Sequence, residues 1–122
     1  MRDRRASLRI VIDDLPCTLF SNTGNELEAE VKNISETGVL LSLGNFPDKL
    51  PEQLKIQFCD EYRDINGEKK SVVLSADIKV VRAEKVDGDL EIGCKFIGFD
   101  GNTRNYLTER ISIDYINKLK RH

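Results

Sequence analysis

The stretch VVLSADIKV, residues 72–80, carries the clearest structural signal in the chain. Apolar side chains occupy every second position from Val72 to Val80, which is the period of a strand with one buried face. The dipeptide Asp87-Gly88 then provides a tight-turn signal of the kind found in hairpins. Directly after it the alternation resumes at Leu90, Ile92, Cys94 and Phe96. We therefore expect two long antiparallel strands joined by a short turn.

The same period-two signal marks four further strands nearer the N-terminus. Residues 10–20 form an interrupted pattern with a break near Asp13 and Asp14, where Pro16 favours an edge or a bulge. Turn residues separate the other strands at 22–25, at 44–52 and at Asn66-Gly67. The apolar positions of these other strands are Leu27, Ala29 and Val31, then Val39, Leu41 and Leu43, and then Leu54, Ile56 and Phe58. Six short strands with tight turns predict a mainly β protein, a small antiparallel barrel.

The period changes from two to three and four after residue 102. This spacing predicts an amphipathic helix over 103–120 that lays its apolar stripe on an open end or side of the barrel. Asn102 or Thr103 is the candidate N-cap. The stripe consists of Tyr106, Leu107, Arg110, Ile111, Tyr115, Ile116 and Leu119.

Length and composition limit the class of protein. A chain of 122 residues with 33% charged residues and a net charge of −2 fits one domain with a working core and no general polyanion-binding role. The three cysteines are odd in number and lack metal-ligand spacing, which predicts reduced thiols, two of them buried, in a cytoplasmic protein. No stretch is apolar enough to suggest direct membrane insertion. His122 is the only histidine, so neither a metal site nor an internal catalytic triad is predicted.

Two clusters of polar residues point to a ligand. Arg5 and Arg9 are four residues apart and offer two planar guanidinium groups, which pair with phosphate oxygens or stack on a nucleobase. Asn33, Ser35 and Gly38 supply an amide, a hydroxyl and a glycine that lets the backbone approach a ligand closely or turn with a positive φ. Because the second cluster joins two predicted strands, its polar groups are expected at the barrel rim.

The pattern R-x-x-x-R followed by D/N-x-S-x-x-G resembles the PilZ family, and the segment Glu91–Gly98 is similar to the closing strand of that family. The resemblance implies a six-stranded antiparallel PilZ-type barrel with a C-terminal helix that binds the bacterial second messenger cyclic di-GMP. It also implies the domain plan: an N-terminal arginine arm over 1–9, a barrel over 10–99 and the helix. The residues implied to contact the ligand are Arg4, Arg5, Arg9, Asn33, Ser35 and Gly38.

Two of these positions carry family-specific expectations. The first position of the second motif is often aspartate, which accepts from two guanine N–H groups, whereas Asn33 has one oxygen acceptor. Asparagine is an allowed variant there, so its effect on affinity stays open. In the family the residue before the first motif arginine influences whether one ligand or an intercalated pair is bound, and Arg4 is compatible with a stacked pair.

A non-catalytic relay follows from these features. We expect the arm to be mobile without ligand, and to order against the rim near Asn33 and Ser35 when cyclic di-GMP binds. The new surface would then engage a downstream protein of the motility, exopolysaccharide or transcription machinery. The sequence chooses neither the partner nor the oligomeric state, and it leaves open whether the 122 residues are a whole protein.

Two alternatives come from other classes of protein. The first is a PilZ-like interaction module that does not bind nucleotide, against which the intact motif residues weigh. The second is a small-barrel nucleic-acid binder, which would need aromatic and basic residues interleaved on its strands. The chain has no Trp, and Phe58, Phe96 and Phe99 lie in apolar patterns. No nucleic-acid partner and no cofactor are therefore predicted.

Overall fold

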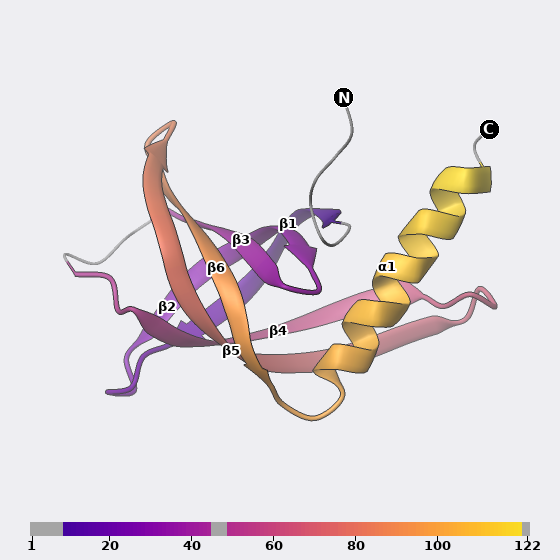
Figure 1. The fold of residues 1–122 in the computed structure, drawn as a ribbon, viewed down its shortest axis with the longest axis horizontal. Helices are drawn as coiled ribbons and strands as arrows, with labels where there is room; N and C mark the ends of the chain where they lie inside the picture. Colours follow the sequence, from indigo (N-terminus) through magenta and orange to yellow (C-terminus); the bar gives the residue numbers. More distant parts are fainter. Residues whose placement is uncertain (1–8, 45–48, 121–122) are drawn as a thin grey trace.

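A computed structural model describes residues 9–44 and 49–120. Its six strands are antiparallel and close into a barrel in the order β1-β2-β3-β6-β5-β4, with one helix at the C-terminus (Figure 1). This is the mainly β architecture that the alternation predicted. The elements are β1 (Arg9–Phe20), β2 (Glu26–Ser35), β3 (Gly38–Leu43), β4 (Gln53–Arg63), β5 (Lys69–Val86), β6 (Asp89–Phe99) and α1 (Thr103–Lys120).

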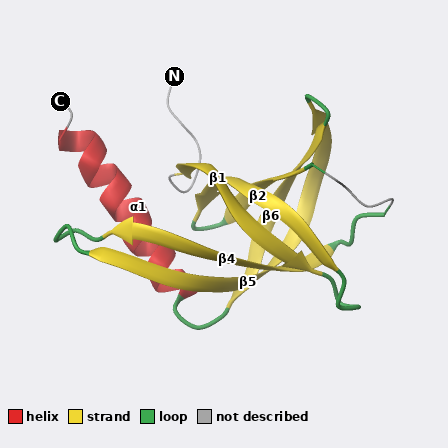
Figure 2. Cartoon of the chain, turned by 180° about the vertical axis from the view of Figure 1, so that it is seen from behind, coloured by secondary structure: helices red, strands yellow, loops and turns green. Residues whose placement is uncertain are grey.

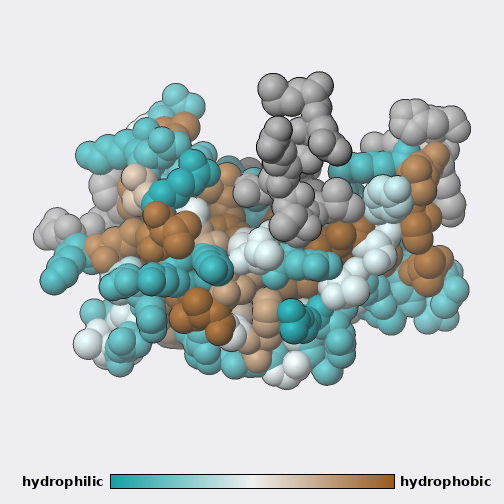
Figure 3. Space-filling view, in the orientation of Figure 1, coloured by the Kyte–Doolittle hydropathy of each residue, from teal (hydrophilic) through white to brown (hydrophobic). Residues whose placement is uncertain are grey.

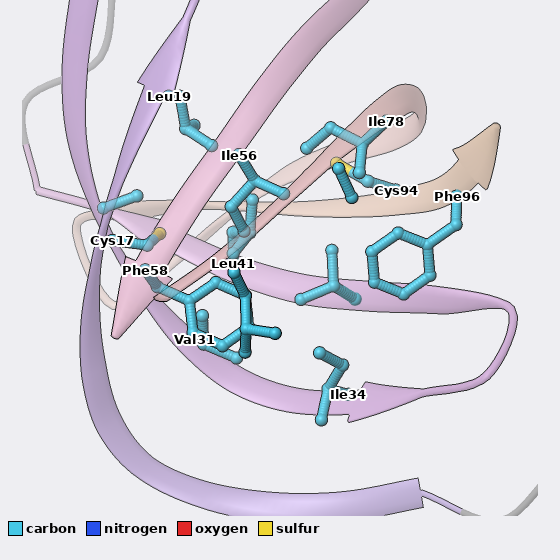
Figure 4. Packing of buried hydrophobic residues seen from close by; sticks show 14 of the residues in the cluster. Cys17, Leu19, Val31, Ile34, Leu41, Ile56, Phe58, Ile78, Cys94 and Phe96 are labelled. Atoms are coloured by element: carbon cyan, nitrogen blue, oxygen red, sulfur yellow. The ribbon is translucent and has the colours of Figure 1, made fainter. Parts of the chain in front are cut away.

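The core lies inside the barrel and comes from all six strands (Figure 4). Leu19, Leu41, Ile56 and Ile78 are fully buried, and each belongs to the apolar half of an alternating strand. The outward positions of β2 are the glutamates at 26, 28 and 30, which are exposed. Burying one face of each strand provides the main driving force for closure of the sheet.

Both hairpins predicted from the sequence are present, and β5 extends beyond the alternating segment of residues 72–80. In the β5–β6 turn, Asp87 has φ 51° and Gly88 φ 87°, as a two-residue hairpin turn requires. In the β4–β5 turn the Asp64 carboxylate accepts hydrogen bonds from the N–H groups of Asn66 and Glu68, both at 2.9 Å. Residues 81–85 are exposed because the β5–β6 hairpin projects beyond the barrel (Figure 1).

Strand β1 agrees with the predicted interruption. Its pairing with β2 shifts register between Val11 and Leu15, so the break near the two aspartates is an irregularity within one strand. The strand begins at Arg9, one residue earlier than the predicted boundary between arm and barrel. Residues 1–8 lie outside the described part of the chain.

A buried polar cluster attaches the helix to β4. The Tyr106 hydroxyl donates to Asp60 Oδ2 at 2.6 Å, and Arg110 Nε donates to the same oxygen at 3.0 Å. The Asp60 side chain is 8% exposed and that of Arg110 is 20% exposed. Next to them the Tyr62 hydroxyl donates to Glu109 at 2.6 Å, and burial raises the pKa of Tyr62 to about 12. Figure 2 shows α1 crossing the β4–β5 pair obliquely.

The helix has the predicted bounds, but its apolar stripe is only half covered. Tyr106, Leu107 and Ile111 are buried, whereas Tyr115 is 51% exposed and Leu119 is 56% exposed. The prediction that the whole stripe packs on the barrel is therefore wrong for the last turns, because α1 slopes away from the strands (Figure 1). Apolar side chains are accordingly visible on the surface of the distal helix (Figure 3). Within the described residues, no helix combines the length and apolar character needed to span a bilayer.

Candidate ligand-binding site

The short connection between β2 and β3 is organised by the hydroxyl of Ser35. Its Oγ accepts hydrogen bonds from the backbone N–H groups of Thr37 at 3.2 Å and of Gly38 at 3.1 Å. Ser35 is 4% exposed, so these bonds are made largely away from water. The geometry therefore assigns Ser35 the role of holding the loop in shape, which positions its neighbours.

Gly38 is required by close packing of two strands. A Cβ at this position would lie 2.5 Å from the backbone oxygen of Cys94 on β6, closer than real Cβ atoms approach. Gly38 is not among the residues with positive φ, so the expectation of a left-handed turn is wrong here. The other expectation, close approach of the backbone to a ligand, stays a prediction, because the close neighbour here is the backbone of β6. The glycine allows β3 and β6 to pair up to the rim.

A β-bulge turns Asn33 to the outside of the barrel. Val31 pairs with Leu41 and Asn33 pairs with Leu40, so β2 has one residue more than β3 at this point. Without that extra residue, Asn33 would continue the inward row of Ala29 and Val31. With it, Ile34 is fully buried and Asn33 borders the outer surface. Bulges commonly redirect a side chain next to a functional site in this way.

A second bulge does the same to Arg82 on β5. Val80 pairs with Cys94 and Arg82 with Gly93, which leaves Val81 as the extra residue. Strict alternation from residue 74 would have sent Arg82 inward, but its side chain is exposed. A Cβ on Gly93 would lie only 2.9 Å from Arg82 Nε and 3.1 Å from its Cγ. The arginine therefore lies across the backbone of Gly93.

These features border one pocket of about 260 Å³ on the outer face of β2, β3, β5 and β6. Register places the residues in a row, because Asn33 pairs with Leu40, Leu40 with Gly93 and Gly93 with Arg82. Among the described residues no carboxylate lines the pocket, whereas Arg82 and Lys95 bring positive charge to it. Its polar lining consists of Asn33, Ser35, Thr37, Gly38, Arg82 and Lys95. The arrangement suits an anion that also presents hydrogen-bonding edges.

The structure brings the second predicted motif and the start of β1 together. Arg9 pairs with Ser35 across the β1–β2 ladder, so the second arginine of the first motif belongs to the strand beside the pocket. Arg4 and Arg5 lie outside the described residues, and the side chain of Arg9 is not described. Contact of these arginines with a ligand stays a prediction.

Sequence reasoning missed Arg82 and Lys95. The two consecutive valines Val80 and Val81 interrupt the period-two pattern just before Arg82, and this interruption is the sequence feature that indicates a bulge there. Lys95 faces outward in the segment that the resemblance used only as a closing strand, and it pairs with Gly38.

The pocket lacks an activated nucleophile. Cys94 contributes to the lining but is 5% exposed, and burial raises the pKa of its thiol to about 12. A thiol with a raised pKa stays protonated and unreactive near neutral pH. The described residues also contain no group of three or more histidine, cysteine or carboxylate side chains placed to hold a metal ion.

Fold and pocket together define a small closed β-barrel with a basic pocket on its outer face. The profile of the PilZ domain matches residues 3–112, which is most of the chain, and the protein therefore belongs to the PilZ domain family. This agrees with the resemblance carried by the two motifs. No curated protein matches the chain in the corresponding comparison.

Solved structures of PilZ-type proteins share the fold. The inhibitor of motility MotI/DgrA of Bacillus subtilis is similar with a TM-score of 0.73 at 15% identity, over 96% of this chain and 54% of that one. The PilZ domain of YcgR from Escherichia coli with c-di-GMP has a TM-score of 0.66 at 17% identity, and 98% of each chain is covered. The K. pneumonia MrkH–c-di-GMP complex has a TM-score of 0.57 at 21% identity, over 98% of this chain and 56% of that one. The chain thus spans about half the length of the first and third of these proteins.

Proposed function

We propose that this PilZ domain is a receptor for cyclic di-GMP and performs no catalysis. The observation that carries the proposal is the pocket, in which Asn33 and two basic side chains border one hollow next to the strand that Arg9 begins. Family membership and the c-di-GMP named in the YcgR and MrkH structures support the choice of ligand.

The chemistry of the ligand suits these groups. Cyclic di-GMP has two phosphodiester charges and two guanines, so it needs cationic groups and a reader of a purine edge. Arg5 and Arg9 would take phosphate oxygens, because guanidinium–phosphate bonds are charge-assisted and often bidentate. Asn33 would accept from the guanine edge. Ser35 and Gly38 would act by holding the loop in shape, since both are fully engaged in the structure.

The size of the pocket supports a role for the N-terminal arm. A volume of about 260 Å³ is small beside the pockets of about 300–1,000 Å³ that enclose drug-sized ligands. A cyclic dinucleotide would therefore leave surface uncovered unless the arm that carries Arg4 and Arg5 closed over it. Ordering of that arm would create a new face for a partner protein and thereby relay the signal.

The class of partner is also a proposal. One protein of the same fold is an inhibitor of motility, which supports output through a motility component. Exopolysaccharide secretion and transcription are the other outputs that the family resemblance suggested. Pull-down with and without cyclic di-GMP tests the relay, which requires a partner whose binding changes with ligand.

Titration calorimetry with cyclic di-GMP, GMP and cyclic di-AMP tests the receptor proposal. We expect guanine-selective binding that falls about 10- to 100-fold in Arg5→Ala and in Arg9→Ala, since each removes at least one charge-assisted contact. Arg63→Ala, an exposed arginine outside the pocket, is the control for loss of one charge. The absence of heat from folded protein at high ligand concentration would leave an interaction module that does not bind nucleotide.

A further inference from the structure

We infer that Arg82 is a ligand-binding residue that reads the guanine of cyclic di-GMP farther from Asn33. Neither sequence motif includes it, and its assignment presupposes the proposed function. It would make the pocket two-ended, with an amide reader on β2 and a guanidinium reader on β5. Arg82 would then determine specificity for the second base of the dinucleotide.

The strand register places Asn33 and Arg82 at opposite ends of one row of cross-strand neighbours. Asn33 and Arg82 are separated by Leu40 and Gly93, one residue on each intervening strand. Three interstrand spacings of about 4.8 Å put their Cα atoms about 14 Å apart. The two side chains therefore border the same pocket from opposite ends.

Three local features aim Arg82 at that pocket. The bulge at Val81 turns the arginine outward, as described above. Gly93 then leaves space above its backbone, and the Arg82 stem and Nε occupy that space. The Arg82 stem thus lies over β6, the strand that pairs with β3 on its other side.

The guanidinium keeps its charge and its donors for a ligand. No carboxylate of the described residues forms an ion pair with Arg82, and none lines the pocket. Lys95 adds a second positive charge to the same hollow. Val81, which is 61% exposed, also lines it and offers an apolar surface for the face of a base.

Arginine at this place favours guanine over adenine. Guanine presents two acceptors, O6 and N7, to which a guanidinium donates two parallel hydrogen bonds. Adenine replaces O6 with an amino donor, which faces the cation with the wrong polarity. Arg82 should therefore separate cyclic di-GMP from the mixed dinucleotide cyclic GMP-AMP, whose single guanine can occupy the Asn33 end.

Calorimetric titration of both dinucleotides tests this assignment. We would compare the wild-type chain with Arg82→Ala, Arg82→Lys and the charge-matched control Arg63→Ala, each checked for folding by urea denaturation. Loss of the guanidinium should weaken cyclic di-GMP binding about 10- to 100-fold and weaken cyclic GMP-AMP binding much less. The preference between the two ligands should thus collapse in Arg82→Ala. Lysine should restore part of the affinity but not the preference, because it is a point charge without the planar fork.

The outcomes separate the assignment from the proposed function. If folded Arg82→Ala binds cyclic di-GMP with wild-type affinity and keeps the wild-type preference over cyclic GMP-AMP, the role of Arg82 is overturned. The receptor proposal would stay intact. An equal loss for both dinucleotides, fully restored by lysine, would also overturn it, because only the charge would then matter. A wild-type chain that binds neither ligand would remove the receptor and the assignment together.

Discussion

Replacing Ser35 with alanine should destabilise the barrel by about 2 kcal/mol. The Ser35 hydroxyl accepts from two backbone N–H groups, at 3.2 and 3.1 Å, and is nearly inaccessible to solvent. Alanine leaves both donors without this acceptor, and each lost hydrogen bond costs roughly 1 kcal/mol net. A loss of about 2 kcal/mol lowers the folding equilibrium constant about 30-fold. Affinity for cyclic di-GMP should fall as well, since the loop would no longer hold Asn33 and Gly38 in place.

Urea denaturation followed by circular dichroism measures this loss. With a slope of about 2 kcal/mol per molar, the midpoint should shift by about 1 M relative to wild type. Ser71→Ala is the matched control because that serine is exposed on β5, and its effect should stay within about 0.5 kcal/mol. If Ser35→Ala keeps the stability of Ser71→Ala and loses only ligand affinity, Ser35 contacts the ligand directly and its assignment as a positioning residue is wrong.

Three further perturbations test the frame that holds the site. Asp60→Ala should cost about 3 kcal/mol or more in urea denaturation, because it leaves the part-buried guanidinium of Arg110 without its carboxylate. Gly38→Ala should lower the melting temperature by several degrees, since its Cβ would clash with the Cys94 carbonyl at 2.5 Å. Stability should also fall as pH rises from about 9 toward 12. Burial raises the pKa of Cys17 and of Cys94 from 9.0 to about 12, so the folded state keeps protons that the unfolded state loses; each thiol contributes a slope of up to about 1.4 kcal/mol per pH unit.

Each of these predictions has its own check. Asp114→Ala removes the carboxylate of a helix-surface ion pair with the exposed Lys118 and should cost under about 1 kcal/mol, so an equal loss from Asp60→Ala would argue against the buried cluster. Gly44→Ala meets no atom closer than 4.0 Å and should leave the melting temperature nearly unchanged. Replacing both buried cysteines with alanine should reduce the alkaline slope, most clearly between about pH 9 and 10, because the raised pKa of Tyr62 adds its own slope only above about pH 10. An unaltered slope would mean that the thiols do not cause it.

The strands and the helix were predictable because their signal is local. Alternation over residues 72–80 reports one buried face whatever the strand pairs with, and Asp87-Gly88 specifies its turn without tertiary help. The break in β1 was visible for the same reason, as two charged residues interrupting an apolar pattern. The bounds of α1 followed from a change of period.

The missed features depend on partners distant in sequence. The bulges before Asn33 and Arg82 arise from a mismatch in residue number between neighbouring strands, which no single strand reveals. The polar cluster at Asp60 joins β4 to a helix about fifty residues later. Likewise, the apolar period of α1 extends to Leu119, but the barrel surface beneath it ends sooner.

For the motif residues, the common location was predictable from the sequence and the individual roles were not. Their presence at one rim was predicted, and Asn33 does border the pocket. Their individual roles were not predictable, because the engagement of Ser35 and the packing of Gly38 appear only when the loop and β6 are in place. Arg4, Arg5 and Arg9 stay predictions for the ligand itself.

The most direct measurement is a titration of ¹⁵N-labelled protein with cyclic di-GMP, followed by amide chemical shifts. We expect the largest changes on the pocket, at Asn33, Thr37, Gly38 and Lys95, while Gly67 in the β4–β5 turn stays unchanged. Shifts concentrated at that turn or on α1, or no shifts at all with ligand in excess, would contradict a cyclic di-GMP site on this face of the barrel.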